Sequence, residues 1–234
     1  MKKLNVDVWS DIACPWCYVG KRRLEAALAR FPERASVTVT WHAFELDPSA
    51  PAVRNDPGTY AERLAKKYGS SVARAEEMIK TMTETAAADG LDFHFERVRA
   101  GNTFDAHRLL HLAHERGVQD ALKERLLRAY MTEGEPIGDR DVLVRLAAEA
   151  GLDAEEAHTA LVTDAFADEV RADEQQARSL GINGVPFFVI GGYGVSGAQP
   201  AEGLLRVLTS AWDEAADEAA PLAEGAACGP DGCA

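Results

Sequence analysis

No stretch of this 234-residue sequence approaches the roughly 20 consecutive apolar residues that would span a bilayer. Basic residues are also scarce: 25 Lys and Arg are outnumbered by 38 Asp and Glu, and the formal net charge is -13. This balance argues against nucleic acid as a partner, because phosphates must be neutralised by Lys and Arg. We therefore expect a protein that binds neither membranes nor nucleic acid.

A signal peptide and a disulfide framework are not indicated either. The first residues, MKKLNVD, contain two lysines but no apolar segment of the kind that signal peptides have. The sequence thus predicts a cytoplasmic protein. It has only four cysteines, and in the cytosol paired cysteines more often serve redox catalysis or bind metal than form structural disulfides.

Strand patterns occur at both ends of the chain. The predicted strands are 4–9, 37–41, 187–190 and 193–196. The first two are joined by a predicted helix at about 14–30 and form a βαβ unit. The last two form a hairpin, and an amphipathic helix follows at about 200–217.

The middle of the chain has helical periodicity and no strand pattern. Helices are predicted at 59–68, 71–88, 103–115, 118–131, 139–150, 153–161 and 164–179. Thr103, Asp139 and Asp164 are the predicted N-caps of three of them, and glycines mark several helix ends. The fold class is therefore α/β, with a small mixed sheet and a large all-α insertion.

The predicted domain division follows from this order. Residues 1–46 and 180–218 form the α/β domain, and residues 47–179 form the helical insertion. Residues 219–234 form a flexible tail that contains cysteines.

Cys14 and Cys17 flank Pro15 and Trp16 at the predicted start of the first helix. Pro15 is compatible with the first turn because its missing N–H would have no intrahelical partner there. Free N–H groups and the positive end of the helix dipole favour the thiolate of Cys14 over its thiol. The sequence therefore predicts Cys14 as the nucleophile and Cys17 as the resolving thiol that attacks a mixed disulfide at Cys14.

Zinc binding is the alternative interpretation of these cysteines, with Cys228 and Cys233 completing four ligands. Zinc-binding pairs normally lie in knuckles rather than in the first turn of a helix. His107, His111 and His114 share a helix face, but no carboxylate or cysteine clearly completes a site around them. We therefore expect redox chemistry and no metal.

A second motif, Gly184-Val185-Pro186-Phe187, precedes the third predicted strand. Pro186 cannot donate a hydrogen bond to a β-ladder, so it belongs at an edge or in a turn. A cis Val185–Pro186 bond there would be a specific local feature, whereas a trans turn proline is the commoner arrangement.

Together these features resemble the DsbA family of thioredoxin-fold oxidoreductases. Residues 11–20 (DIACPWCYVG) and 181–188 (GINGVPFF) are similar to its FrnE-like branch. That branch also resembles 2-hydroxychromene-2-carboxylate isomerases and kappa-class glutathione transferases. The resemblance covers about residues 1–215 and implies a thioredoxin fold, βαβ…ββα, with a helical insertion.

The resemblance implies a cis Pro186 against the Cys14–Cys17 pair, with the Val185 backbone pairing with a bound peptide or with glutathione. The isomerases and transferases carry Ser where this chain has Cys14, so a dithiol indicates thiol–disulfide exchange instead. Secreted DsbA proteins commonly have His where this chain has Trp16, so we expect a less extreme oxidant.

Cys228 and Cys233 enclose a Gly-Pro-Asp-Gly sequence that permits a tight reversal and a disulfide within the tail. A flexible tail could present this pair to the active site at a high effective concentration. Our hypothesis is a redox relay that regenerates or regulates the Cys14–Cys17 pair. An inert oxidised tail or adventitious metal binding is the alternative.

The leading functional hypothesis is a thiol–disulfide oxidoreductase that acts on dithiol or disulfide protein substrates. No tightly bound cofactor is expected, and glutathione is a candidate co-substrate. The redox potential decides whether the protein acts as an oxidase, a reductase or an isomerase. The alternatives are a glutathione-dependent isomerase or transferase of small aromatic compounds, and a chaperone-like or metal-binding module. A monomer or a homodimer is expected.

Overall fold

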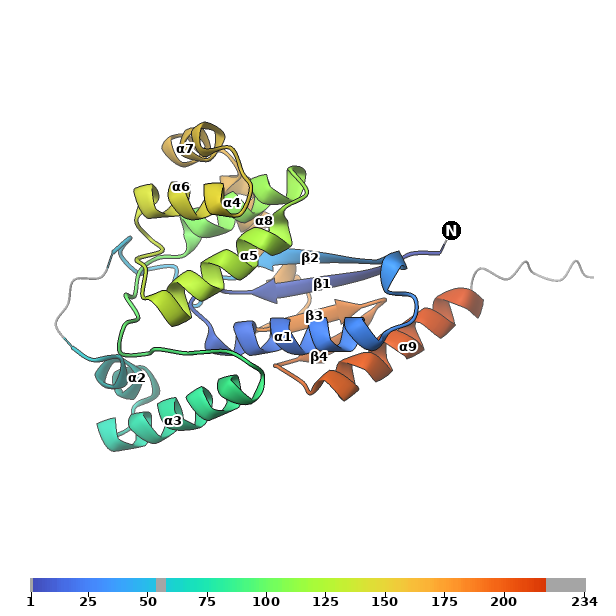
Figure 1. Cartoon of the computed structure of the whole chain (residues 1–234), viewed down its shortest axis with the longest axis horizontal. Helices are drawn as coiled ribbons and strands as arrows, with labels where there is room; N and C mark the ends of the chain where they lie inside the picture. Colours follow the sequence, from blue (N-terminus) through green and yellow to red (C-terminus); the bar gives the residue numbers. More distant parts are fainter. Residues whose placement is uncertain (1, 54–57, 218–234) are drawn as a thin grey trace, which may run out of the picture.

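The structure is a computed structural model that describes residues 2–53 and 58–217. Within these ranges the strands are β1 (Leu4–Ser10), β2 (Val37–Ala43), β3 (Phe187–Ile190) and β4 (Tyr193–Ser196). They form a sheet in the order β2-β1-β3-β4, in which β1 is parallel to β2 and the other pairs are antiparallel. The predicted mixed sheet, built from both ends of the chain, is confirmed (Figure 1).

One face of the sheet is covered by α1 (Pro15–Arg30) and α9 (Ala201–Asp217) (Figure 1). Alternate side chains of the strands point to this face, because successive strand residues point to opposite sides. Val8 and Phe188 are fully buried there and pack in one apolar cluster with Leu204 of α9. Burial of this apolar surface holds the two terminal segments of the chain together.

The opposite face of the sheet contacts α8 (Ala167–Ser179). Trp9 of β1 packs there against Ala177, and its Nε1 donates to the backbone carbonyl of Asp173 at 3.1 Å. Helix α8 lies inside the range 47–179 predicted as the insertion, yet it forms one of the layers around the sheet.

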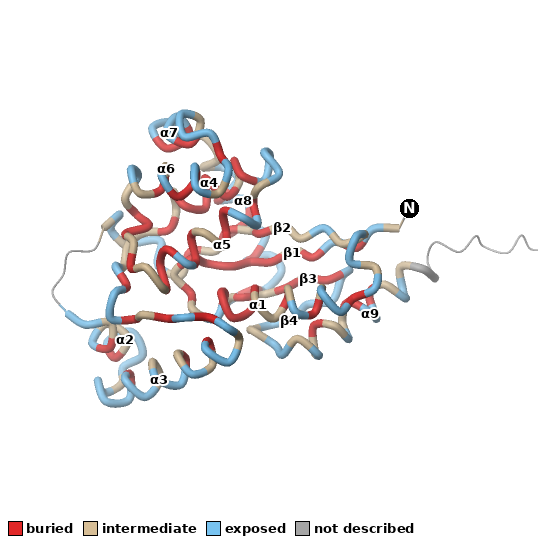
Figure 2. Tube along the Cα trace, viewed as in Figure 1, coloured by how far each residue is buried: buried red, intermediate tan, exposed pale blue. Residues whose placement is uncertain are grey.

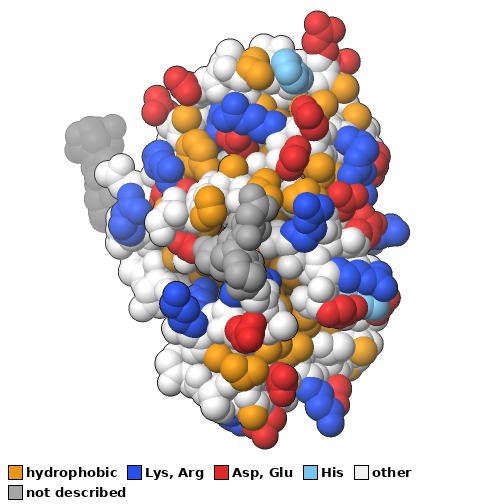
Figure 3. Space-filling view, turned by 90° about the vertical axis from the view of Figure 1, so that its left-hand side faces the viewer, with side chains coloured by type: hydrophobic (Ala, Val, Ile, Leu, Met, Phe, Trp, Pro, Cys, Tyr) orange, Lys and Arg blue, Asp and Glu red, His pale blue; other side chains and the backbone are white. Residues whose placement is uncertain are grey.

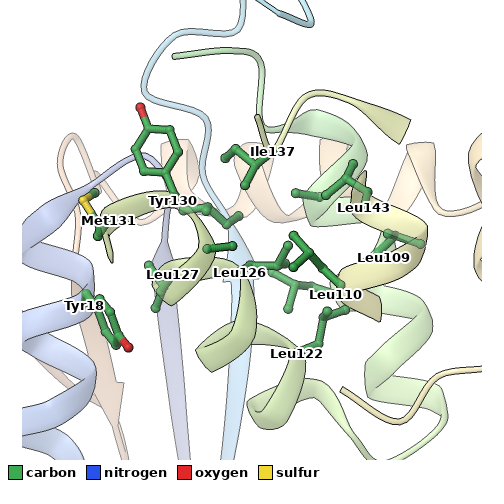
Figure 4. Packing of buried hydrophobic residues seen from close by; sticks show 14 of the residues in the cluster. Tyr18, Leu109, Leu110, Leu122, Leu126, Leu127, Tyr130, Met131, Ile137 and Leu143 are labelled. Atoms are coloured by element: carbon green, nitrogen blue, oxygen red, sulfur yellow. The ribbon is translucent and has the colours of Figure 1, made fainter. Parts of the chain in front are cut away.

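The other helices form the rest of the insertion: α2 (Tyr60–Tyr68), α3 (Val72–Ala88), α4 (Phe104–Glu115), α5 (Gln119–Arg128), α6 (Arg140–Glu149) and α7 (Ala154–Val162). The buried faces of α4 to α7 and part of α3 meet in one apolar core, whereas Ala61 and Ala65 of α2 pack with Ala75 of α3 in a small separate cluster. The outer faces of these helices are exposed (Figure 2). Leu109 and Leu110 of α4 lie beside Leu122 and Leu126 of α5 in this core, and Tyr18 of α1 also belongs to it (Figure 4). No helix in the described part of the chain is long and apolar enough to cross a membrane.

Helix ends mostly follow the sequence prediction. Asp139 caps α6, and its side chain accepts from the backbone N–H of Val142 at 3.2 Å. A positive φ is found at the predicted terminal glycines Gly69, Gly90, Gly117 and Gly151. The predicted helix 118–131 consists of two segments, because α5 ends at Arg128 and a π-helical turn, Ala129–Glu133, follows.

One predicted N-cap is confirmed in position only, and another is wrong. Thr103 is the N-cap of α4, but its side chain makes no capping hydrogen bond. Instead, Oδ1 of Asn102 accepts from the backbone N–H of Phe104 at 2.8 Å. Helix α8 begins after Phe166, which has a φ of 61°, and not after Asp164.

Candidate active site

The Cys14–Cys17 pair lies where β1 leads into α1. Cys14 is the N-cap of α1, with extended backbone angles (φ -99°, ψ 113°), and Pro15 occupies the first turn. The backbone N–H of Cys17 donates to the carbonyl of Cys14 at 3.0 Å. Both cysteines are free thiols, and only 5% and 1% of their surfaces are exposed. Both sulfurs therefore lie at the amino end of a long helix.

Val185 and Pro186 come from the other end of the chain and lie beside this pair. The Val185–Pro186 peptide bond is cis, and Sγ of Cys14 donates to the Val185 carbonyl at 3.5 Å. A Cβ on Gly20 of α1 would lie 2.9 Å from Cγ of Pro186, so the close approach of Pro186 to α1 requires glycine there. The fold thus brings together the two motifs that the sequence singles out.

Asp11, in the turn after β1, has a buried carboxylate for which the sequence suggested no role. Its oxygens accept from the backbone N–H of Leu46 at 2.8 Å and of Ala13 at 3.3 Å, and Nε2 of His107 lies 3.4 Å away. Burial alone would raise the pKa of Asp11, but His107, Leu46 and Thr103 lower it below its usual value. The Thr103 side chain bonds to Asp11, which explains why it does not cap α4.

Lys123 of α5 is a second buried ionisable group near the cysteines. It is fully buried, and its Nζ donates to the carbonyl of Ser10 at 3.4 Å. Burial lowers the pKa of Lys123 to about 8, although the negative charges of Cys17 and Asp11 act in the opposite direction. Burial also raises the pKa of Cys17 well above its usual value; the neighbouring Cys14 adds to this effect, and the charge of Lys123 opposes it.

One signal in the sequence could have identified Lys123. It lies three and four residues before Leu126 and Leu127, so these three residues share one face of α5. Both leucines are fully buried. A lysine within an apolar stripe is unusual, because charged groups are rarely buried without a partner.

A cavity of about 850 Å³ opens beside Cys14, between the cysteine motif and the α2–α3 hairpin. Its cationic lining residues are Arg63, Lys66, Lys67 and Arg74. Tyr60 of α2 also lines the cavity. Its pKa is raised to about 12, mainly by burial and secondly by the charge of Cys14. Figure 3 shows the end of the molecule that carries α2, where basic, acidic and apolar side chains are mixed.

The remaining predicted site residues are placed as follows. Pro15 and Trp16 line the cavity, and 41% of the Trp16 surface is exposed. Cys228 and Cys233 lie outside the described residues.

The three histidines on α4 do not form one site. His107 lies beside Asp11, Nε2 of His111 lies 2.9 Å from Oδ2 of Asp173, and His114 is exposed. In the chain as described, no group of three or more His, Cys, Asp or Glu side chains is arranged to hold a metal ion.

Comparison with known proteins identifies the family. Residues 5–209 match the DSBA-like thioredoxin domain family. This chain is a member of that family. Its mixed sheet with a helical insertion is therefore a DsbA-like thioredoxin fold, and the resemblance stated from the two motifs is confirmed.

Individual relatives support this assignment. The chain is 32% identical over 197 residues to the uncharacterized protein YwbO of Bacillus subtilis, covering 83% of this chain and 90% of that protein. It is 48% identical to a probable DsbA oxidoreductase of Streptomyces coelicolor, whose crystal structure superposes with a TM-score of 0.85 over 99% of this chain and 98% of that one. The cytosolic disulfide reductase DsbM of Pseudomonas aeruginosa, solved with glutathione, is 19% identical and shares the fold, with a TM-score of 0.58 over 92% and 96% of the two chains.

Proposed function

We propose that this protein is a thiol–disulfide oxidoreductase in which Cys14 is the nucleophile and Cys17 the resolving thiol. The observation that carries the proposal is the 3.5 Å contact between Sγ of Cys14 and the Val185 carbonyl. Because of this contact, the sulfur at the helix terminus lies beside backbone groups that can pair with an extended substrate.

In the reductase direction, the Cys14 thiolate attacks one sulfur of a substrate disulfide. The substrate S–S bond breaks, one substrate sulfur leaves as a thiolate, and the other forms a mixed disulfide with Cys14. Cys17 then attacks the Cys14 sulfur, which releases the second substrate thiolate and leaves a Cys14–Cys17 disulfide. The substrate gains two electrons and the enzyme loses two. The oxidase direction is the reverse sequence.

In this proposal the substrate enters through the cavity beside Cys14, whose walls include Pro15 and Trp16. Val185 and Pro186 position the substrate against the Cys14 sulfur. The cavity lining has four cations against the three carboxylates of Asp11, Asp47 and Glu77. In a protein that is otherwise strongly acidic, this local excess of positive charge favours an anionic substrate or co-substrate, such as glutathione or an acidic peptide segment. The DsbM structure with glutathione supports glutathione as a co-substrate. We place the reaction in the cytoplasm, where a reducing glutathione pool favours the reductase or isomerase direction.

Reduction of insulin by dithiothreitol or glutathione tests the proposal. We expect Cys14→Ser to abolish catalysis, because the attacking sulfur is lost. We expect Cys17→Ser to accumulate a covalent mixed disulfide on Cys14, because the resolving thiol is lost. Insulin reduction by Cys14→Ser at the wild-type rate, or no trapped intermediate with Cys17→Ser, would refute the assignment. The potential of the Cys14–Cys17 couple, measured against glutathione, then determines the direction.

Cys228 and Cys233 remain the proposed relay to this couple. Their replacement by Ser in the full-length chain should change the turnover or the redox state of the Cys14–Cys17 pair. Unchanged turnover together with an unchanged potential would remove the relay but leave the oxidoreductase assignment intact.

A further inference from the structure

Two buried lysines lie near the first helix, and they differ in their partners. Lys21 of α1 is 1% exposed and forms ion pairs with Glu25, with Asp120 at 3.2 Å and with Glu124 at 3.3 Å. Lys123 of α5 is fully buried and, among the described residues, has no carboxylate within ion-pair distance. A buried ammonium without a carboxylate partner is costly, so Lys123 requires another explanation.

The only hydrogen bond that Nζ of Lys123 makes within the described chain is the 3.4 Å contact with the Ser10 carbonyl. The amine also lies 5.6 Å from the centre of the Trp41 ring. One carbonyl and one ring face leave donors of the amine without partners, since an ammonium has three N–H donors. These contacts alone do not compensate for burial of a full charge.

The charged and titratable groups around Lys123 come from the helix that carries the redox motif and from the turn before it. Nζ of Lys123 lies at the Ser10 carbonyl, where the β1–α1 turn begins, and the next carbonyl, that of Asp11, accepts from the backbone N–H of Cys14 at 3.3 Å. Asp11 of this turn, and Cys14, Cys17 and Lys21 of α1 or its N-cap, each interact electrostatically with Lys123. Asp11 already accepts hydrogen bonds from two backbone N–H groups and lies beside His107. Two groups of this cluster lose a proton during sulfur exchange, Cys14 and Cys17. Cys17 is the more buried of the two, with 1% of its surface exposed against 5% for Cys14.

We propose that Lys123 is the proton acceptor for Cys17 in the resolving step, an inference that rests on the oxidoreductase function proposed above. The neutral amine of Lys123 takes the Sγ proton of Cys17, which produces a thiolate and an ammonium ion. The Cys17 thiolate attacks Sγ of Cys14 in the mixed disulfide and forms the Cys14–Cys17 bond. The Cys14–substrate bond breaks, and the substrate thiolate leaves with the electron pair and takes a proton from water.

This assignment explains two features of the cluster. Burial raises the pKa of Cys17, so Cys17 cannot readily lose its proton to water. Burial also lowers the pKa of Lys123 to about 8, so part of the population holds a neutral amine at physiological pH. Burial thus disfavours each isolated charge, whereas a thiolate and an ammonium formed together attract one another.

The test separates the two chemical steps. The reduced full-length protein, with both tail cysteines replaced by Ser in every sample, is mixed with dithiobis(nitrobenzoate), whose released thiolate is coloured. Attack by Cys14 releases the first coloured thiolate, and resolution by Cys17 releases the second. In the wild-type site, we expect the rate of the second phase to rise with pH and to level off above the Lys123 midpoint near pH 8.

Lys123→Met preserves the size and apolar character of the side chain but removes the base. We expect its second phase to slow on the order of 100-fold at pH 7 and to keep rising at alkaline pH, whereas the first phase changes less than about threefold. Arg125→Met is the control, because it removes another cation of α5, one that pairs with Glu133 at 2.8 Å and with Glu149 at 2.6 Å. Its two phases should stay within about twofold of the wild-type rates, since the electrostatic partners of that guanidinium are these two carboxylates and not the cysteines.

Two results would overturn the assignment of Lys123. One is a Lys123→Met variant whose second phase keeps the wild-type rate and pH midpoint. The other is a wild-type second phase that does not change with pH between about pH 6 and about pH 10, a result that is decisive even if the variant does not fold. Absence of the first phase in the wild-type protein would instead refute the function proposed for Cys14.

Discussion

Asp173 of α8 connects the helical segment to the sheet, and its removal should destabilise the protein strongly. Its Oδ1 lies 2.7 Å from Nδ1 of His42 on β2, and its Oδ2 lies 2.9 Å from Nε2 of His111 on α4. Oδ2 also accepts from the backbone N–H of Ala43 at 2.8 Å. One buried carboxylate therefore joins α4, α8 and β2, and Asp173→Asn tests this connection.

The expected loss follows from these contacts. A hydrogen bond to a charged group contributes about 1.5 to 3 kcal/mol. The amide of Asp173→Asn can keep one acceptor for Ala43 but places a donor opposite one imidazole and loses the charge that attracts both. We therefore expect a loss of about 3 kcal/mol. In a domain of this size, that loss lowers the melting temperature by about 6 to 12 °C.

The difference between wild type and variant should depend on pH. Burial would lower the pKa of His42, but Asp173 and Asp7 raise it above 6.5. The stability that protonated His42 contributes is therefore complete below pH 6.5 and is lost as pH rises through the raised pKa. Burial would raise the pKa of Asp173, but His111 and His42 lower it below 3.8. The contribution of the Asp173 carboxylate to stability is therefore present above pH 3.8 and is lost as pH falls through the lowered pKa. The difference should be largest between these two pH values.

Urea denaturation at a series of pH values measures this difference. Asp168→Asn is the matched control: Asp168 is an exposed residue of the same helix, and its replacement should cost at most about 1 kcal/mol at every pH. A difference below about 1 kcal/mol for Asp173→Asn, or a difference that does not shrink above pH 6.5, would show that Asp173 is not the connection described here.

Three further substitutions test the surroundings of the dithiol. Gly20→Ala places a Cβ 2.9 Å from Cγ of Pro186. It should destabilise the protein by about 1 to 3 kcal/mol in urea denaturation, and it should slow insulin reduction because Pro186 moves. Wild-type stability together with a wild-type rate would contradict the contact. Tyr60→Phe removes a hydroxyl near the Cys14 thiolate and should lower the rate of Cys14 alkylation about threefold at pH 7, whereas an unchanged rate would mean that the hydroxyl does not stabilise the thiolate. Asp11→Asn should lower the free energy of unfolding by about 2 kcal/mol, because an amide nitrogen cannot accept from a backbone N–H; an unchanged urea midpoint would contradict this.

Much of the fold could be predicted because its local signals agree with its packing. The strand alternation of β1 and the apolar periodicity of the helices identify the same faces that the tertiary structure buries. The failures occur where a tertiary contact overrides local preference. Thr103 is a good N-cap by type, but its hydroxyl bonds to Asp11 instead. Phe166 starts α8 with a positive φ, which is uncommon for a bulky residue, so no sequence rule would select it.

The reactive centre was predictable only in part. Cys14, Cys17 and Pro186 are identified by two short motifs whose residue types restrict the chemistry. Asp11 directly precedes the first motif, yet nothing in the sequence shows that its carboxylate is buried. Lys123 is about a hundred residues from the motif, and no periodicity within α5 indicates which distant group its amine approaches.

The helical segment places side chains around the dithiol and does not merely cover it. α2 provides Tyr60 at the Cys14 side, α4 provides His107 beside Asp11, and α5 provides Lys123 beside Cys17. Of these groups, Lys123 acts on a thiol directly, because its charge opposes the rise in the pKa of Cys17. A family that keeps one dithiol motif can therefore change its reactivity by altering the helices packed behind and above it. If the motif performs the sulfur exchange proposed above, the insertion is the part of the fold that can adjust how readily Cys17 gives up its proton.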